Sequence, residues 1–211
     1  GKAIYLASRL ASAGRSFTRF DYRGHGRSSG HYTDYTVTDW LEDVLAVIDR
    51  LTEGPLVLVG SSLGGWLALR AAELRPERVK GQVLIAPAPD FPVLRVLNCL
   101  TAAERQLYEA EGVVVDTSSG FSDPTRFTRN FIESSRTESI FTRPYHFNGP
   151  VRVLQGMQDT AVPWQQSAEL VEHIKASDVR LMLFKEGDHR LAHPSQLEVL
   201  GQMVDEVLVR V

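Results

Sequence analysis

Short, continuous apolar segments alternate with longer stretches of helical periodicity, and this alternation constrains the fold more than any other feature of the chain. The apolar segments LVLV, QVLIA, VRVLQ and VRLMLF occupy residues 56–59, 82–86, 151–155 and 179–184. The continuous run LVLV is typical of a strand buried on both faces of a parallel sheet, and the other three segments are expected to be strands as well. Helical patterns occupy residues 3–14, 37–51, 63–75, 164–175 and 195–209. The sequence therefore predicts an α/β fold with a mostly parallel sheet flanked by helices.

Two further segments complete the expected organisation. Residues 16–23 (SFTRFDYR) are rich in aromatic and β-branched residues, which predicts another strand leading into a glycine-rich loop. Residues 90–148 break the strand–helix alternation, and because a structureless loop of that length is rare, they are interpreted as a small inserted lid. With 43% hydrophobic residues in 211, the chain can build one normal core, so residues 1–211 are expected to form a single domain.

The composition excludes several classes of protein. A net charge of -3 without runs of like charge provides no electrostatic footprint for nucleic acid. The longest charge-free stretch, residues 54–69, is shorter than the roughly 20 apolar residues that a bilayer span needs. The only cysteine, Cys99, allows neither an internal disulfide nor a cysteine-based zinc cluster, and we interpret it as a small buried apolar residue.

The motif G-x-S-x-G occurs twice, but only one copy lies between a predicted strand and a predicted helix. Residues 60–64 (GSSLG) follow the LVLV strand directly and begin the next helix, which is the context of a nucleophile elbow that projects Ser62 above the sheet edge. Residues 26–30 (GRSSG) lie within a loop and precede no apolar helix, so Ser28 is interpreted as part of an ordinary turn. Ser62 is therefore the predicted nucleophile.

A serine nucleophile needs a base, and the base needs an acid that orients it. In this fold the chain order is serine, acid, histidine. Asp159 follows the 151–155 strand and His189 follows the last strand, so both would reach the same sheet edge as Ser62. Rival groups are less well placed. His193 precedes Pro194 and is expected to cap the last helix or to face solvent, while Asp188 is adjacent to His189 and is expected to bond within its own loop.

These motifs resemble those of the α/β-hydrolase superfamily along essentially the whole chain, from FDYRGHGRSSG to GDHR. The strings GSSLGGWL, GMQDTAVPW and DHR look like the acyl-protein thioesterase and acyl-glucuronide esterase branch. The resemblance implies a small lid, no cofactor, and ester or thioester substrates with bulky acyl groups. It places Ser62, Asp159 and His189 at the positions of the catalytic triad, and the backbone N–H of Leu63 in half of the oxyanion hole. We assign no metal site.

The same resemblance raises an expectation about the start of the chain. In the superfamily further strands precede the helix predicted at residues 3–14, and the loop before that helix donates the second oxyanion N–H. We therefore expect that the N-terminal strands are missing here, that about 30 to 50 residues precede Gly1 in the natural protein, and that the second donor is not in this chain.

Substrate contacts are less well indicated than the triad. Phe121, Phe127 and Phe131 in the lid are candidates to line an acyl pocket, although aromatic residues in a lid more often form the lid's own core. Trp164 lies close to Asp159 in sequence and is a candidate for the pocket border. Expected partners are a small-molecule or acylated substrate in the cytoplasm, or alternatively in an organelle, and the oligomeric state stays open. The competing function is a non-catalytic binding protein on the same fold.

Overall fold

A four-stranded parallel sheet forms the centre of the molecule. The structure, a computed structural model, describes residues 1–116 and 125–211. The strand order is β1-β2-β6-β8, where β1 is Leu56–Ser61, β2 Val79–Ile85, β6 Val151–Gly156 and β8 Val179–Phe184. All three neighbouring pairs are parallel. Each predicted apolar segment forms one of these strands, so the prediction of a parallel sheet is confirmed, and the carboxyl ends of the strands share one edge.

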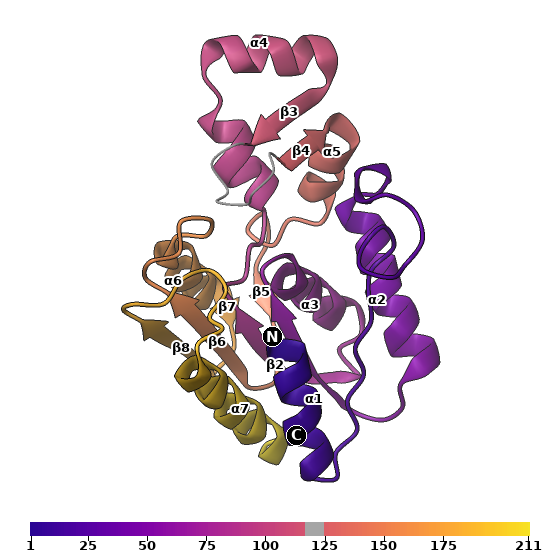
Figure 1. Ribbon diagram of the computed structural model, residues 1–211, viewed down its shortest axis with the longest axis vertical. Helices are drawn as coiled ribbons and strands as arrows, with labels where there is room; N and C mark the ends of the chain where they lie inside the picture. Colours follow the sequence, from indigo (N-terminus) through magenta and orange to yellow (C-terminus); the bar gives the residue numbers. More distant parts are fainter. Residues whose placement is uncertain (117–124) are drawn as a thin grey trace.

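Helices cover both faces of the sheet (Figure 1). On one face, α1 (Lys2–Ser12) and α7 (Pro194–Val209) pack on a cluster that includes Val83, Ile85 and Leu154. On the other face, α2 (Val37–Leu51), α3 (Leu63–Leu74) and α6 (Trp164–His173) pack on a cluster that includes Leu84 and Val153. Adjacent residues of β2 and β6 thus point into opposite clusters, as the alternation of side chains along a strand requires.

The strand predicted at residues 16–23 is wrong. The structure describes residues 15–22 as extended chain without strand pairing (Figure 1), followed by the turns of the glycine-rich loop and the short 3-10 helix η1 (Tyr32–Asp34). The aromatic and β-branched composition favours an extended backbone, but a strand also needs a partner that shares its N–H and C=O groups. No strand in the described residues pairs with this segment. Local composition alone therefore predicted the shape of the backbone but not its pairing.

An insertion, defined here as residues 91–138, projects from the carboxyl edge of the sheet at the top of Figure 1. It contains a π-helical turn η2 (Pro92–Val96), a 3-10 turn η3 (Leu97–Cys99), α4 (Ala102–Glu111), the antiparallel strands β3 (Val113–Asp116) and β4 (Thr125–Thr128), and α5 (Arg129–Thr137). These elements bury a cluster of their own. The chain then returns to the main core through β5 (Tyr145–His146), which pairs with β7 (Ile174–Lys175).

Two features of the insertion bear on the sequence predictions. Cys99 is exposed, so its interpretation as a buried residue is wrong; Val96 and Leu97 occupy the apolar side of that turn, and Cys99 ends it on the solvent side. At the base, the buried carboxylate of Asp90 accepts hydrogen bonds from the Ser139 hydroxyl and from the backbone N–H of Ile140 at 2.9 Å. Because Asp90 precedes the insertion and Ser139 follows it, these bonds join its two ends.

Candidate active site

Ser62 lies in a strained turn between β1 and α3. Its backbone dihedrals are φ 56° and ψ -120°, a region that residues with a Cβ rarely adopt. The turn is fixed by hydrogen bonds to the end of β2, because the Ser62 N–H donates to Ile85 O at 2.9 Å and the Ser62 C=O accepts from Ala88 N–H at 3.2 Å. The surrounding structure thus holds the serine in the conformation that a nucleophile elbow requires.

Close backbone packing explains why glycines flank this turn. A Cβ added to Gly60 would lie 2.2 Å from the carbonyl oxygen of Gly64, and one added to Gly65 would lie 2.9 Å from Pro87 Cβ. A Cβ on Gly64 would meet only the Tyr22 hydroxyl, at 3.4 Å. The approach of α3 to β1 therefore demands glycine at position 60, and its approach to the chain after β2 demands glycine at position 65. Position 64 has ordinary space.

The structure brings together the three side chains that the sequence predicts as a triad. His189 Nε2 lies 3.1 Å from Ser62 Oγ, and His189 Nδ1 lies 2.7 Å from Asp159 Oδ2. Because a carboxylate only accepts, the network assigns the ring proton to Nδ1 and leaves the Nε2 lone pair facing the serine hydroxyl. The loops that carry Asp159 and His189 are joined by backbone hydrogen bonds, from Met157 N–H to Phe184 O at 2.9 Å and from Gln158 N–H to Gly187 O at 2.8 Å.

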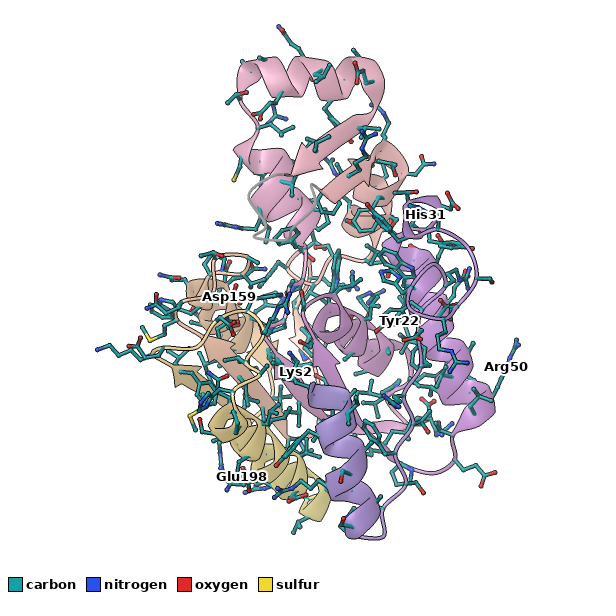
Figure 2. All side chains as sticks on the ribbon, viewed as in Figure 1. Lys2, Tyr22, His31, Arg50, Asp159 and Glu198 are labelled. Carbon is teal, nitrogen blue, oxygen red and sulfur yellow. The ribbon has the colours of Figure 1, made fainter. Side chains whose placement is uncertain are left out.

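Asp159 is buried and fully hydrogen-bonded on the edge of the sheet that faces the insertion, where it is labelled in Figure 2. Its Oδ1 accepts the backbone N–H groups of Ala161 at 2.9 Å and Val162 at 2.8 Å. Burial acts to raise the pKa of this carboxyl, but the hydrogen bonds from His189 and from the Val162 N–H outweigh it and hold the pKa below its ordinary value of 3.8. Asp159 is therefore ionised wherever an imidazole titrates.

The rival residues have the structural roles that their positions indicate. The Ser28 hydroxyl donates to the backbone carbonyl of Asp21 at 2.7 Å. Asp188 Oδ1 accepts the backbone N–H groups of Arg190 and Leu191, which closes its own loop. His193 caps the N-terminus of α7. The expectations for His193 and Asp188 are confirmed, and Ser28 is bound within its turn.

A pocket of about 250 Å³ opens over Ser62 and His189, between the main core and the insertion. Its walls are mostly apolar and aromatic, and they include Leu63 and the two lid residues Phe127 and Phe131. Trp164 is not among the described residues that line it, so that prediction is wrong. Ala161 and Val162, which Asp159 draws inward through their N–H groups, occupy this side of the pocket instead. Phe121 lies outside the described residues.

Sequence reasoning missed most of the aromatic wall. Rings from α2, α5, β4 and the start of η2 follow one another, with centroid distances of 5.6 Å for Trp40–Phe131, 5.4 Å for Phe127–Phe131 and 6.2 Å for Phe91–Phe127. His25 packs edge-on against Trp40 at 4.9 Å. The helical spacing of Trp40 correctly indicated a buried face, but nothing in that spacing distinguishes a core from a pocket. Other lining residues not foreseen are Tyr32, Thr33, Tyr35, Trp66, Ala88, Pro92 and Thr128.

The electrostatics of the pocket suit a reaction that develops negative charge. Leu63 is the first residue of α3, and the first N–H groups of a helix have no acceptor in the helix's own ladder and carry a partial positive charge. Leu63 also borders the pocket beside Ser62. Among residues 1–116 and 125–211, no group of three or more histidine, cysteine, aspartate or glutamate side chains could hold a metal ion. Within the same residues, no helix has the length and apolar character that crossing a bilayer takes.

Comparisons with known proteins identify similar chains. Residues 1–130 match the family model described as serine aminopeptidase, S33. The mitochondrial palmitoyl-protein thioesterase ABHD10 of Mus musculus is 35% identical over 215 residues, which cover 98% of this chain and 70% of that protein. The Homo sapiens protein of the same name is 34% identical and covers the same share of this chain. A solved structure, alpha/beta hydrolase domain-containing protein 10 from mouse, superposes with a TM-score of 0.92 at 36% identity, covering 99% of this chain and 83% of that chain.

Proposed function

Because this chain belongs to the α/β-hydrolase family of its ABHD10 relatives and is a hydrolase of ester or thioester bonds, we propose that it works through Ser62, His189 and Asp159 as a catalytic triad. The observation that carries the proposal is the continuous hydrogen-bonded line from Ser62 Oγ through His189 to Asp159 on the wall of an apolar pocket. The distance between Ser62 Oγ and His189 Nε2 lies within the range that proton transfer needs, and the distance between His189 Nδ1 and Asp159 Oδ2 is that of a hydrogen bond that orients the ring.

The proposed reaction has two halves. Ser62 Oγ attacks the carbonyl carbon of the substrate while His189 Nε2 accepts its proton, and the Leu63 N–H stabilises the oxyanion. The tetrahedral intermediate collapses, the leaving alcohol or thiol takes the proton from His189, and the acyl group remains on Ser62. Water then attacks the acyl-enzyme with His189 as base, which releases the acid and regenerates the serine. Asp159 holds the ring and stabilises the imidazolium in both halves.

The substrate class follows from the pocket that surrounds the serine. An apolar acyl group would bury itself against the aromatic wall, at about 0.8 kcal/mol per methylene removed from water. The relatives are named palmitoyl-protein thioesterases, which supports a hydrophobic acyl thioester or ester as the substrate. Their name also supports a mitochondrial location, the organellar alternative to the cytoplasm.

The test compares two serine variants of the protein. Ser62→Ala should lose hydrolysis of acyl esters by several orders of magnitude and lose labelling by a fluorophosphonate probe, because the attacking oxygen is gone. Ser28→Ala, the matched control in the second G-x-S-x-G, should keep both. Turnover of Ser62→Ala at the wild-type rate would refute the assignment, and a wild-type protein that neither turns over esters nor reacts with the probe would indicate a binding protein.

A further inference from the structure

Behind Asp159 a second line of buried side chains runs to α6. The amide nitrogen of Gln155, on β6, lies 2.9 Å from Asp159 Oδ2, and the Ser167 hydroxyl, on α6, lies 2.8 Å from the amide oxygen of Gln155. Both Gln155 and Ser167 are completely buried, with 0% of their surface exposed. The Asp159 oxygen that faces His189 is thus the same oxygen that the Gln155 amide holds.

The orientation of the Gln155 amide is fixed by chemistry. Its nitrogen has three acceptors around it, Asp159 Oδ2, the carbonyl of Val162 at 3.1 Å and the carbonyl of Gly156 at 3.2 Å. Rotating the amide by 180° would place its oxygen against these three acceptors, which would leave buried oxygens without donors. Ser167 supplies the donor that the amide oxygen requires on the opposite side. In the observed orientation the two N–H groups of the amide donate to these oxygens and its own oxygen accepts from Ser167, whereas a turned amide would lose all of these bonds.

We propose that Gln155, locked by Ser167, is a positioning residue for the hydrolysis inferred above, acting by holding the Asp159 carboxylate in the direction that orients His189. The proposal rests on the proposed function of the triad. With His189, Gln155 and the N–H groups of Ala161 and Val162, four donors surround the carboxylate, which matches its acceptor capacity. The carboxylate is therefore held in one buried position, and its bond to Nδ1 sets the orientation of the His189 ring.

The Gln155 amide also sets how strongly Asp159 attracts the imidazolium. Because Gln155 donates to Oδ2, part of the charge on that oxygen is already compensated before His189 becomes protonated. Removing this donor concentrates the charge on the bond to His189 and stabilises the imidazolium. On the acid side of the kcat/KM profile, activity should then fall at a higher pH than in the wild type. Looser packing alone would not produce such a shift.

Other titratable groups near His189 are left in place by this change. On its own loop these are Asp188 and Arg190, and on α1 the Lys2 ammonium contacts the Arg190 carbonyl. Across the pocket are His25 from the glycine-rich loop and Arg126 from the insertion. A shift of the profile in a Gln155 variant therefore reports the altered carboxylate and not a changed set of neighbouring charges.

The first experiment compares two buried glutamines. Gln155→Met should lower kcat about 10- to 100-fold, the rate equivalent of a hydrogen bond to a charged group, and should move the acid limb of kcat/KM upward by up to about one pH unit. Gln166→Met is the matched control, because Gln166 is buried on α6 and its side-chain amide donates to the Pro89 carbonyl, at 2.8 Å, and not to the triad. It should lose stability without moving the acid limb.

The second experiment keeps the proposal testable if Gln155→Met does not fold. Ser167→Ala retains the Gln155 amide but removes the hydroxyl that holds the amide oxygen. It should therefore lower kcat less than Gln155→Met does, and it should move the acid limb of kcat/KM in the same direction. Histidine NMR should show the His189 titration moving with the limb, and it needs no substrate. Variants that lose activity only as much as Gln166→Met, with the acid limb and the His189 titration unmoved, would overturn the proposal. A wild-type protein without ester turnover would instead overturn the proposed function.

Discussion

The two glycines of the Ser62 motif should respond in opposite directions to alanine. In Gly60→Ala the new Cβ would lie 2.2 Å from Gly64 O, 2.5 Å from Gly64 C and 2.7 Å from Gly65 N. A carbon and an oxygen in weak contact stay about 3.3 Å or more apart, so α3 must move away from β1 by about 1 Å. All three neighbours are backbone atoms, which cannot rotate away. Such overpacking costs about 1 to 3 kcal/mol or more.

Gly64→Ala provides the matched control within the same turn. Its Cβ would meet the Tyr22 hydroxyl at 3.4 Å, which is an ordinary van der Waals contact. Gly64 lies in the first turn of α3, where alanine is favoured over glycine by up to about 1 kcal/mol. We therefore expect Gly64→Ala to be neutral or slightly stabilising. The two variants should differ by about 1 to 4 kcal/mol in the free energy of unfolding.

Thermal unfolding and ester turnover, measured on the same preparations, check this reasoning. At about 2 to 4 °C per kcal/mol for a domain of this size, Gly60→Ala should lower Tm by several degrees, whereas Gly64→Ala should not. Because Ser62 moves with α3, Gly60→Ala should also lose about 100-fold in kcat/KM. Equal Tm values for Gly60→Ala and the wild type, or equal losses in both variants, would show that close packing does not dictate the glycine at position 60.

Two further predictions concern a charge cluster and the pocket wall. Hydrogen bonds from the buried Arg152 lower the pKa of Asp178 and of Glu206. The stability that these two ionised carboxylates contribute is therefore fully present above their pKa values in the unfolded chain, about 4 and 4.5, and it is lost as the pH falls through their lower pKa values in the folded protein. Arg152→Met should therefore lower the free energy of unfolding, measured with urea at pH 7, by about 3 kcal/mol, and the difference from the wild type should become smaller below about pH 4. A difference that does not change with pH would show that the ion pairs are not its cause. Phe131→Ala removes a ring that packs on Trp40, so kcat/KM should fall about 10-fold for long acyl esters but little for acetyl esters, and equal losses for both would argue against an acyl wall.

Local sequence signals predicted the elements that are determined locally. The helix predicted at residues 37–51 is α2, and Thr36 with Asp39 forms a capping box at its start, with both partners within one turn. The segment predicted at residues 179–184 matches β8 residue for residue. The predicted strand at residues 16–23 failed because pairing depends on a neighbour that the segment itself does not encode.

The triad could be predicted from local sequence signals, whereas most of the pocket wall could not. Ser62, Asp159 and His189 could be foreseen because each follows a strand of one parallel sheet, whose carboxyl ends must meet at one edge. Trp40 belongs to a helix whose buried face looks like any other core-facing surface. Its exposure to a pocket depends on how α5 of the insertion packs above α2, and no periodicity within α2 records that arrangement.

The geometry of the site depends on close backbone contacts as much as on its reactive side chains. A Cβ on Gly60 would strike Gly64 O at 2.2 Å, and a Cβ on Gly156 would strike Gly187 O at the same distance. The first contact sets the turn that carries Ser62. The second brings the end of β6, before Asp159, against the loop that carries His189. Because backbone atoms cannot change rotamer, the first contact fixes the turn that presents Ser62, and the second fixes the strand end before Asp159 against the loop that carries His189.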